Sequence, residues 1–302
     1  MKEGRGYALI LGASLFWGTS ATAAKLLLQN NVDTILIVQT RVTFSVVLML
    51  AWFGITAPRL LRIHVRDIWR FALLGIAGVA GANFAYYYAI RESTVATAIL
   101  LQYTAPVLVM GYAVVMREER ITPVKAGAAF LSLAGCVLAV TGRDVGAVHI
   151  TRSGLLAGML ASACFAYLNI YTRHLLARYS AWTVTVYSLL GASLFWLVIN
   201  PPWRVAMDSS SPWGALVLFA IMSILIPHSL YFNGLRFVVP SRAVITSTFE
   251  PVVAIVSAAV ILGDFLDGLQ VLGAFLVIAA IILLQLRREE SRVPTPGESR
   301  HA

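Results

Sequence analysis

The sequence predicts an all-α integral membrane protein of ten transmembrane helices, built as two inverted repeats of five helices. Three observations predict this fold: an apolar composition with ten apolar runs, an uneven distribution of Lys and Arg, and an internal repeat. Of the 302 residues, 59% are hydrophobic and only 12% are charged, whereas soluble domains contain about 25% charged residues. A membrane-spanning helix needs ~20 apolar residues, so the chain is long enough for about ten.

The apolar runs are separated by short connections that contain turn-forming and charged residues. The expected transmembrane helices cover residues 7–28, 34–56, 68–90, 94–115, 123–141, 153–172, 181–200, 213–235, 242–262 and 267–286. The first run leads directly into further runs, so we expect it to be retained rather than cleaved as a signal peptide. The polar segment 289–302 is expected to be a disordered cytoplasmic tail.

Lys and Arg are concentrated in alternate connections, which sets the expected topology. If both termini are cytoplasmic, 17 of the 23 basic residues fall on the inner side, five on the outer side, and Arg41 lies within a helix. Lys and Arg mark cytoplasmic loops of membrane proteins. The bias therefore predicts an even number of helices with both ends inside.

Several functional classes are excluded by the same composition. The net charge of +9 could indicate nucleic acid, but the basic residues stand singly between apolar runs and form no patch. Cys136 and Cys164 both lie inside apolar runs, and two thiols provide neither a disulfide framework nor a metal site. We expect no cofactor and no metal.

The second half of the chain repeats the first at a spacing of 145 residues. Matched polar and proline positions are harder to obtain by chance than matched Leu and Ala. The matching pairs are Tyr86 and Tyr231, Arg91 and Arg236, Ala98 and Ala243, Pro106 and Pro251, and Glu119 and Asp264. The expected repeats are residues 1–148 and 149–288.

Each repeat contains five helices, an odd number, so the second repeat must enter the membrane in the opposite orientation to the first. Inverted repeats are a construction of secondary transporters, in which the substrate binds near the midplane between the halves. Alternating access then follows from rocking of one half against the other. The sequence therefore predicts a carrier of small solutes that works as a monomer in a lipid bilayer.

The residues also resemble a known family. Trp17-Gly18 in the first helix, Arg41 in the second and Glu250-Pro251 in the ninth resemble the drug/metabolite transporter superfamily, and in particular its ten-helix EamA-type exporters. The chain is similar to bacterial exporters of aromatic and other amino acids. The first repeat departs from the pattern, because Ala105-Pro106 stands where the second repeat has Glu250-Pro251.

The resemblance implies a basket of ten helices around a central cavity in the bacterial inner membrane. The first four helices of each repeat would line the cavity, and the fifth and tenth would pack outside. The implied activity is export of amino acids, including aromatic ones, from the cytoplasm.

Glu250 and Arg41 are the charged residues that lie deepest in the expected helices. An ionisable group inside a membrane is costly and indicates a functional site. Glu250 could pair with Arg41, bind the ammonium group of a substrate, or relay a proton. Arg41 could bind a substrate carboxylate or hold Glu250, and a purely structural pair remains the alternative for both.

Other polar and aromatic residues within the helices are candidates for the cavity wall. Asn83 and His228 occupy the same position of the repeat. Aromatic walls with few charges suit an amphipathic zwitterion or a neutral solute and suit a phosphorylated sugar poorly. The candidates besides Arg41 and Glu250 are Trp17, Gln39, Asn83, Tyr87, Tyr103, Tyr167, His228, Ser247 and Thr248.

Prolines and glycines within the helices are candidate hinges or gates. Proline removes a backbone hydrogen bond and kinks a helix, and small residues allow close packing or bending. The candidates are Gly78, Gly81, Pro106, Pro227 and Pro251. A static kink or simple helix packing is the alternative explanation.

Three alternatives to an amino-acid exporter remain: an organic-cation carrier, an intramembrane enzyme, and a channel or receptor. A carrier of the same superfamily could export drugs or organic cations, which a free Glu250 without an engaged Arg41 would favour. An intramembrane enzyme is disfavoured, because the sequence has no His-Glu-x-x-His, no Gly-x-Ser-x-Gly and no second deep acid. The inverted repeat argues against a channel or a receptor.

Overall fold

Helices account for nearly all of the described chain. The structure is a computed structural model that describes residues 2–29, 34–119, 121–144, 150–201, 213–263 and 265–286; the expected tail at 289–302 lies outside these residues. The α-helices are α1 (Lys2–Gln29), α2 (Thr34–Thr56), α3 (Ile68–Leu73), α4 (Gly81–Glu92), α5 (Val95–Gln102), α6 (Ala105–Val115), α7 (Pro123–Thr141), α8 (Arg152–Leu176), α9 (Ala181–Ile199), α10 (Trp213–Ala220), α11 (Ile226–Gly234), α12 (Pro240–Ser247), α13 (Phe249–Leu262) and α14 (Gly268–Leu286).

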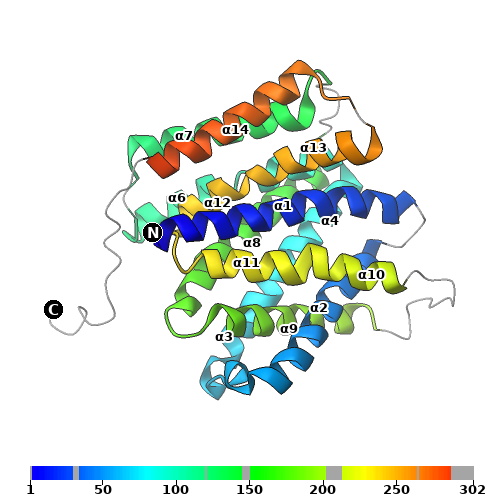
Figure 1. Cartoon of the computed structure of the whole chain (residues 1–302), viewed down its shortest axis with the longest axis vertical. Helices are drawn as coiled ribbons and strands as arrows, with labels where there is room; N and C mark the ends of the chain where they lie inside the picture. The colour runs from blue at the N-terminus through cyan, green and yellow to red at the C-terminus, as the bar shows by residue number, and fades with distance from the viewer. Residues whose placement is uncertain are drawn as a thin grey trace.

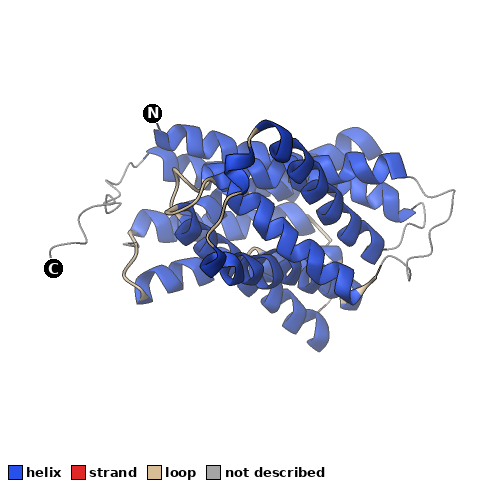
Figure 2. Cartoon of the chain, turned by 90° about the horizontal axis from the view of Figure 1, so that it is seen from below, coloured by secondary structure: helices blue, strands red, loops and turns tan. Residues whose placement is uncertain are grey.

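Ten helical segments of the described chain are long and apolar enough to cross a membrane, which confirms the predicted number. They are Glu3–Ala24, Ile35–Thr56, Val65–Glu92, Ala96–Val115, Pro123–Thr141, Arg152–Leu176, Ala181–Ile199, Trp213–Gly234, Pro240–Ile261 and Gly268–Leu286. Figure 2 shows these helices joined by short loops, and the described residues contain no strand. The chain is therefore an all-α, polytopic membrane protein.

The helices are packed side by side, and the pair formed by α7 and α14 lies at one edge of the bundle (Figure 1). Helices α7 and α14 lie together at one edge of the molecule, and α2, α3 and α9 lie at the opposite edge. Between them, α1 packs against α11 and α13, and α4 packs against α8. The start of α1 and the end of α14 lie on the same side of the molecule, as an even number of spans requires.

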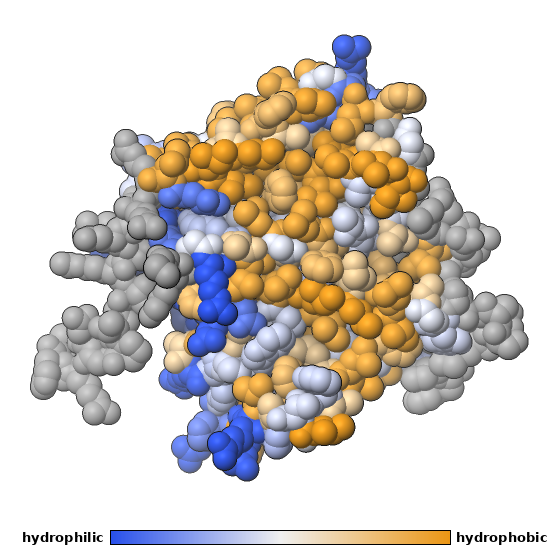
Figure 3. Space-filling view, viewed as in Figure 1, coloured by the Kyte–Doolittle hydropathy of each residue, from blue (hydrophilic) through white to orange (hydrophobic). Residues whose placement is uncertain are grey.

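The outer face of the bundle is apolar (Figure 3). Hydrophobic residues cover most of the visible face, and hydrophilic residues gather at the side where the N-terminus lies. Large side chains such as Phe130 and Val198 are more than two-thirds exposed. Exposed apolar side chains of this size are unfavourable in water and are accommodated by lipid.

Two pairs of transmembrane segments are interrupted. The third and eighth segments contain π-helical turns, at Leu74–Ala80 and Ile221–Leu225. The fourth segment breaks between α5 and α6 at Tyr103 and Thr104, and the ninth breaks between α12 and α13 at Thr248. Interruptions of a transmembrane helix occur where the backbone is buried in protein or lines a cavity.

Side-chain caps explain where several helices begin. Thr122 and Ser180 accept hydrogen bonds from backbone N–H groups at the starts of α7 and α9, which are otherwise unpaired. Asp267 does the same for α14, accepting from Leu269 and Gln270, and it also accepts from the backbone N–H of Arg143. These N–H groups hold the pKa of Asp267 below its usual value.

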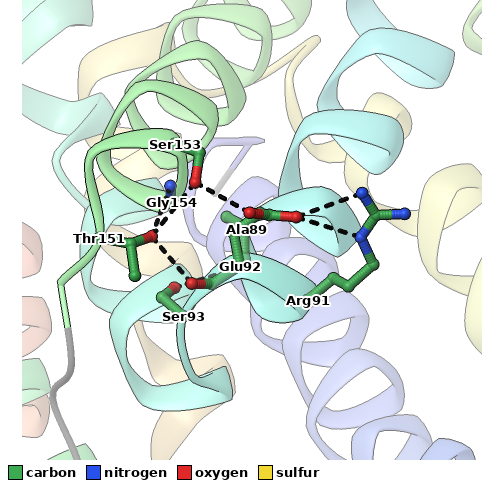
Figure 4. A network of polar contacts seen from close by, with 7 residues as sticks. All are labelled: Ala89, Arg91, Glu92, Ser93, Thr151, Ser153 and Gly154. Carbon is green, nitrogen blue, oxygen red and sulfur yellow. Dashed lines mark hydrogen bonds and ion pairs between the residues drawn. The ribbon is translucent and has the colours of Figure 1, made fainter.

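A polar network ties the end of α4 to the start of α8 (Figure 4). Thr151 caps α8 by accepting from the N–H of Gly154 at 3.0 Å, and its hydroxyl donates to the Glu92 carbonyl at 2.8 Å. Ser153 donates to the Glu92 carboxylate at 2.9 Å, and Arg91 pairs with the same carboxylate at 3.2 Å. The negative charge at the N-terminus of α8 is favoured by the helix dipole.

Helices α7 and α14 meet at two facing glycines. A Cβ atom on Gly135 would lie 2.8 Å from the carbonyl oxygen of Gly273 and 2.8 Å from the backbone nitrogen of Val277. Both obstacles are backbone atoms, so neither helix has a flexible group that moves aside. Small residues let membrane helices approach this closely.

Replacement of Gly135 by leucine should therefore destabilise the protein. Overpacking of a tight contact costs about 1–3 kcal/mol, which corresponds to a fall in apparent melting temperature of roughly 2–5 °C for a chain of this size. Thermal unfolding in detergent measures the effect. Gly127→Leu on the same helix is the control, because no atom lies within 4 Å of its Cβ position; equal melting temperatures for the two variants would contradict the packing described.

Candidate functional site

Arg41 of α2 points to α4, the helix that follows the π-helical turn. Its guanidinium donates to the Asn83 side-chain oxygen and, at 3.4 Å, to the Tyr87 hydroxyl, and it lies 5.6 Å from the centre of the Tyr87 ring. Asn83 is itself oriented by a 2.7 Å bond to the Val79 carbonyl. The Nε atom of Arg41 is buried without a hydrogen-bond partner, so the cation is held by neutral groups and retains donor capacity.

Glu250 lies where the broken fourth and ninth segments meet. The Tyr103 hydroxyl donates to its carboxylate at 2.7 Å and lies 3.4 Å from the Ser247 carbonyl. Helix α1 approaches α13 closely here: a Cβ atom on Gly18 would lie 2.7 Å from the Glu250 carbonyl. The glycine of the Trp17-Gly18 pair therefore allows α1 to pack beside the acid.

A third group joins α1, α8 and α11. The Trp17 ring lies 5.4 Å from His228 in an edge-to-face arrangement and 5.1 Å from Tyr231. The Tyr231 hydroxyl donates to the side-chain oxygen of Asn169 at 2.6 Å. Aromatic contacts of this kind add to the burial energy of the rings, so the three helices are held together at this depth.

Helix α1 joins two of the three groups, because Trp17 belongs to the aromatic group and the neighbouring Gly18 packs against the Glu250 carbonyl. No ion pair joins Arg41 to Glu250 in the part of the chain that the structure describes. Of the alternatives for these two residues, a direct salt bridge is therefore not formed in this conformation.

Three of the candidate cavity residues satisfy their polar groups within the protein. Gln39 donates to the backbone carbonyl of Asn200, at the end of α9, at 2.8 Å and accepts from the Asn200 side-chain amide at 2.9 Å. Ser247 and Thr248 are buried and donate to carbonyls three residues earlier in their own helix. The structure places these residues at helix contacts and at the break before α13.

The candidate hinge residues all lie at helix interruptions. Gly78 is within the first π-helical turn and Gly81 begins α4, while Pro227 follows the second π-helical turn. Pro106 and Pro251 lie in the first turns of α6 and α13, directly after the breaks. Pro106 and Pro251 thus start new helices rather than kink continuous ones, because a first-turn residue has no intrahelical N–H bond to lose, whereas Pro227 lies within the continuous segment Trp213–Gly234.

Tyr167 lies apart from the other candidates. It lines a cavity of about 800 Å³ between α3, α6 and α8, and none of the other predicted cavity residues lines it. Its ring stacks on Tyr171 with centres 5.1 Å apart. We refer to this cavity as the α8 crevice.

Sequence reasoning missed a buried charge network on the side of the chain ends. Arg242 pairs with Glu3 at 2.6 Å and donates to Tyr7, while Glu119 pairs with Lys125 at 3.7 Å and accepts from the Ser241 hydroxyl. Arg242 and Lys125 were expected only as markers of the cytoplasmic side, yet both are at least 95% buried. A basic residue at the start of a helix looks the same in sequence whether it faces water or a carboxylate.

Ten apolar spans fit a polytopic membrane transporter, and within the described residues they hold an acid and a base that form no salt bridge with each other. The chain belongs to the EamA-like transporter family, whose family model matches residues 4–141 and residues 152–286. The family confirms the predicted resemblance to the drug/metabolite transporter superfamily and the assignment as a membrane transporter.

Curated relatives are transporters of similar length. The chain is 22% identical to the uncharacterized inner membrane transporter YicL of Salmonella typhimurium, covering 93% of this chain and 95% of YicL. It is 31% identical to the threonine/homoserine exporter RhtA of the same species over 70% of both chains. It is 28% identical to a probable terminal-alkyne amino-acid exporter of Streptantibioticus cattleyicolor over 81% of both chains.

A solved crystal structure has the same fold. It superposes with a TM-score of 0.79 at 21% sequence identity and covers 93% of this chain and 96% of its own. At this identity the likeness supports the ten-helix fold alone.

Proposed function

We propose that this protein exports amino acids across the inner membrane by alternating access, with both termini in the cytoplasm. One observation carries the proposal: Arg41 and Glu250 share the interior of the bundle, yet each is held by neutral side chains instead of by the other. A zwitterionic amino acid offers a carboxylate for the guanidinium and an ammonium group for the carboxylate. The RhtA and terminal-alkyne exporters support the substrate class, and YicL supports the inner membrane.

The proposed mechanism uses two inverted repeats, residues 1–148 and 149–288. The interruptions support the repeat, because the break at Tyr103 falls on the break at Thr248 when the chain is shifted by 145 residues. The capping residues agree, since Thr122 falls on Asp267 at the same shift. Asp264, the expected counterpart of Glu119, lies outside the described residues. Because one chain contains both halves, we propose that it works as a monomer.

The bound substrate would lie between Arg41 on one side and Glu250 on the other. Trp17, Tyr86 and Tyr87 would supply apolar walls near these charges. Closure around the substrate would bend the chain at the four interruptions, which are the points with the fewest regular helical hydrogen bonds. The buried pairs of Arg242 with Glu3 and Glu119 with Lys125 would separate when the cavity opens on their side.

A carrier of organic cations is the second candidate. Glu250 accepts from a neutral tyrosine and has no direct basic partner among the described residues, so a cationic substrate could bind it. Arg41 distinguishes an amino-acid exporter from an organic-cation carrier. Its guanidinium would bind the carboxylate of an amino acid, whereas it adds no binding energy for a cation.

Counterflow in proteoliposomes tests the proposal. Internal unlabelled threonine, homoserine or an aromatic amino acid should drive uptake of the same labelled compound. Trp17→Ala should abolish this exchange, whereas Trp52→Ala should retain it, because Trp52 is 65% exposed on the outer face of α2. Exchange of lipophilic cations without exchange of any amino acid would overturn amino-acid export in favour of the second candidate.

A further inference from the structure

The α8 crevice is an uncovered strip of one transmembrane helix. Along α8, the lining residues follow one another at helical spacing of three to four, so they form a single face. The neighbouring helices α3 and α6 border this face on its two sides. The lining residues of this face include Ala163, Tyr167, Ile170, Tyr171, His174 and Arg178.

The chemistry of the crevice changes along its length. The part deeper in the bundle is lined by Ala163, Leu108 and Ile170. The part nearer the side of the chain ends is lined by His174 and Arg178. From residue 163 to residue 178 the distance is ~22 Å at 1.5 Å per residue. One leaflet of hydrocarbon is ~15 Å thick, so the crevice spans the acyl and head-group levels of a single leaflet.

The end of the crevice near Arg178, on the side of the chain ends, is positively charged. Arg70 pairs with Asp67 at 3.0 Å and lies over the Trp69 ring, and His174 pairs with Glu118 at 3.1 Å. Arg178 is exposed at the mouth. Arg66 and Arg117 are exposed and neighbour Asp67 and Glu118 in the sequence, so four arginines stand against these two carboxylates and this end of the molecule attracts an anion.

Aromatic residues lie between the apolar and the basic parts. Trp69 and Tyr112 flank the crevice, and the stacked rings of Tyr167 and Tyr171 lie along α8. Trp and Tyr favour the depth of the lipid head groups and glycerol backbone. The crevice thus has an apolar part, aromatic side chains beside it and basic residues at one end. This combination matches an acidic phospholipid, because basic pockets between transmembrane helices bind acidic head groups.

We propose that the α8 crevice binds an acidic phospholipid from the leaflet on the side of the chain ends. An acyl chain lies along Ala163, Tyr167 and Ile170, and the phosphate lies at Arg178 and Arg70. None of the residues proposed to hold the transported solute, such as Arg41 or Glu250, lines this crevice. The lipid site is therefore separate from the proposed substrate site, and its test does not depend on the transported compound.

Native mass spectrometry of the detergent-purified protein tests the proposal, with phosphatidylglycerol and phosphatidylcholine of identical acyl chains as probes. Wild-type protein should retain phosphatidylglycerol preferentially. Arg178→Gln should weaken that binding about fivefold, as expected for one basic residue at a lipid surface, while Arg59→Gln, an exposed arginine on the same side, should not. Ala163→Trp, at an exposed position of the crevice wall, should remove both lipids from the site.

Ala279→Trp, an exposed alanine on α14, is the matched control and should bind phosphatidylglycerol as wild type does. Melting temperatures without added lipid establish that each variant is folded. Equal binding of the two lipids, or unchanged binding in both Arg178→Gln and Ala163→Trp, would overturn the proposal. Loss of counterflow in Ala163→Trp with phosphatidylglycerol binding intact would assign the crevice to the solute pathway instead.

Discussion

Arg41→Gln is expected to reduce amino-acid counterflow by about 100-fold at low substrate concentration. Truncating one member of a buried, hydrogen-bonded charge contact costs roughly 2–5 kcal/mol, and each 1.4 kcal/mol is tenfold in affinity. The loss arises because the carboxylate of the substrate would face a neutral amide in place of a guanidinium with free donors. Initial rates over a range of substrate concentrations measure the effect, which should appear mainly as a raised KM.

Two companion variants make this result specific. Arg41→Lys retains the charge but loses the planar fork of donors, so it should recover part of the affinity. Arg59→Gln removes an exposed arginine outside the site and should leave KM unchanged. If Arg41→Gln transports amino acids with the KM of wild type, then Arg41 has only a structural role with Asn83 and Tyr87.

Glu250→Gln is expected to abolish the pH dependence of transport. A glutamine has nearly the same shape and can still accept a hydrogen bond from Tyr103, but it has no proton to exchange. In wild type, a carboxyl group that alternates between protonated and charged forms would couple the transport cycle to a proton gradient. Counterflow and gradient-driven uptake measured across a series of pH values would reveal this dependence.

Tyr103→Phe is the control for the Glu250 experiment. It removes the 2.7 Å hydrogen bond to the carboxylate and leaves the ionisable group in place, so transport should remain pH-dependent. Persistence of the wild-type pH dependence in Glu250→Gln would exclude a proton relay at this residue. The acid would then act only as a partner for the ammonium group of the substrate.

The elements of the fold could be predicted because each leaves a local signal. Apolar runs of ~20 residues require a membrane, and the ten predicted runs coincide with the ten spans of the structure. Pro106 and Pro251 also signalled the breaks before α6 and α13. Gly78 and Pro227 marked the positions of the two π-helical turns, but the type of turn could not be predicted, because an extra residue in an apolar helix resembles its neighbours.

The contacts of the site could be predicted only in part. Arg41 and Glu250 were conspicuous because a charge inside an apolar run is rare, but their partners come from other helices. Gln39 was predicted to line the cavity, but in the structure its side-chain amide donates a hydrogen bond to Asn200, 161 residues away in the sequence. Asn169, which accepts the hydrogen bond of Tyr231, was not predicted as a site residue. Like Asn83, it is a single amide within an apolar run, and this pattern could have indicated it.

The π-helical turn at Leu74–Ala80 also constrains how the chain can change in evolution. Such a turn holds one residue more than a regular α-helix would use. Because the turn absorbs this residue locally, a deletion of one residue there would restore the regular helix and leave Asn83 and Tyr87 facing Arg41. A single-residue gap at this point in a related sequence is therefore compatible with the same binding chemistry, whereas a gap elsewhere in the segment would turn the following residues by ~100°.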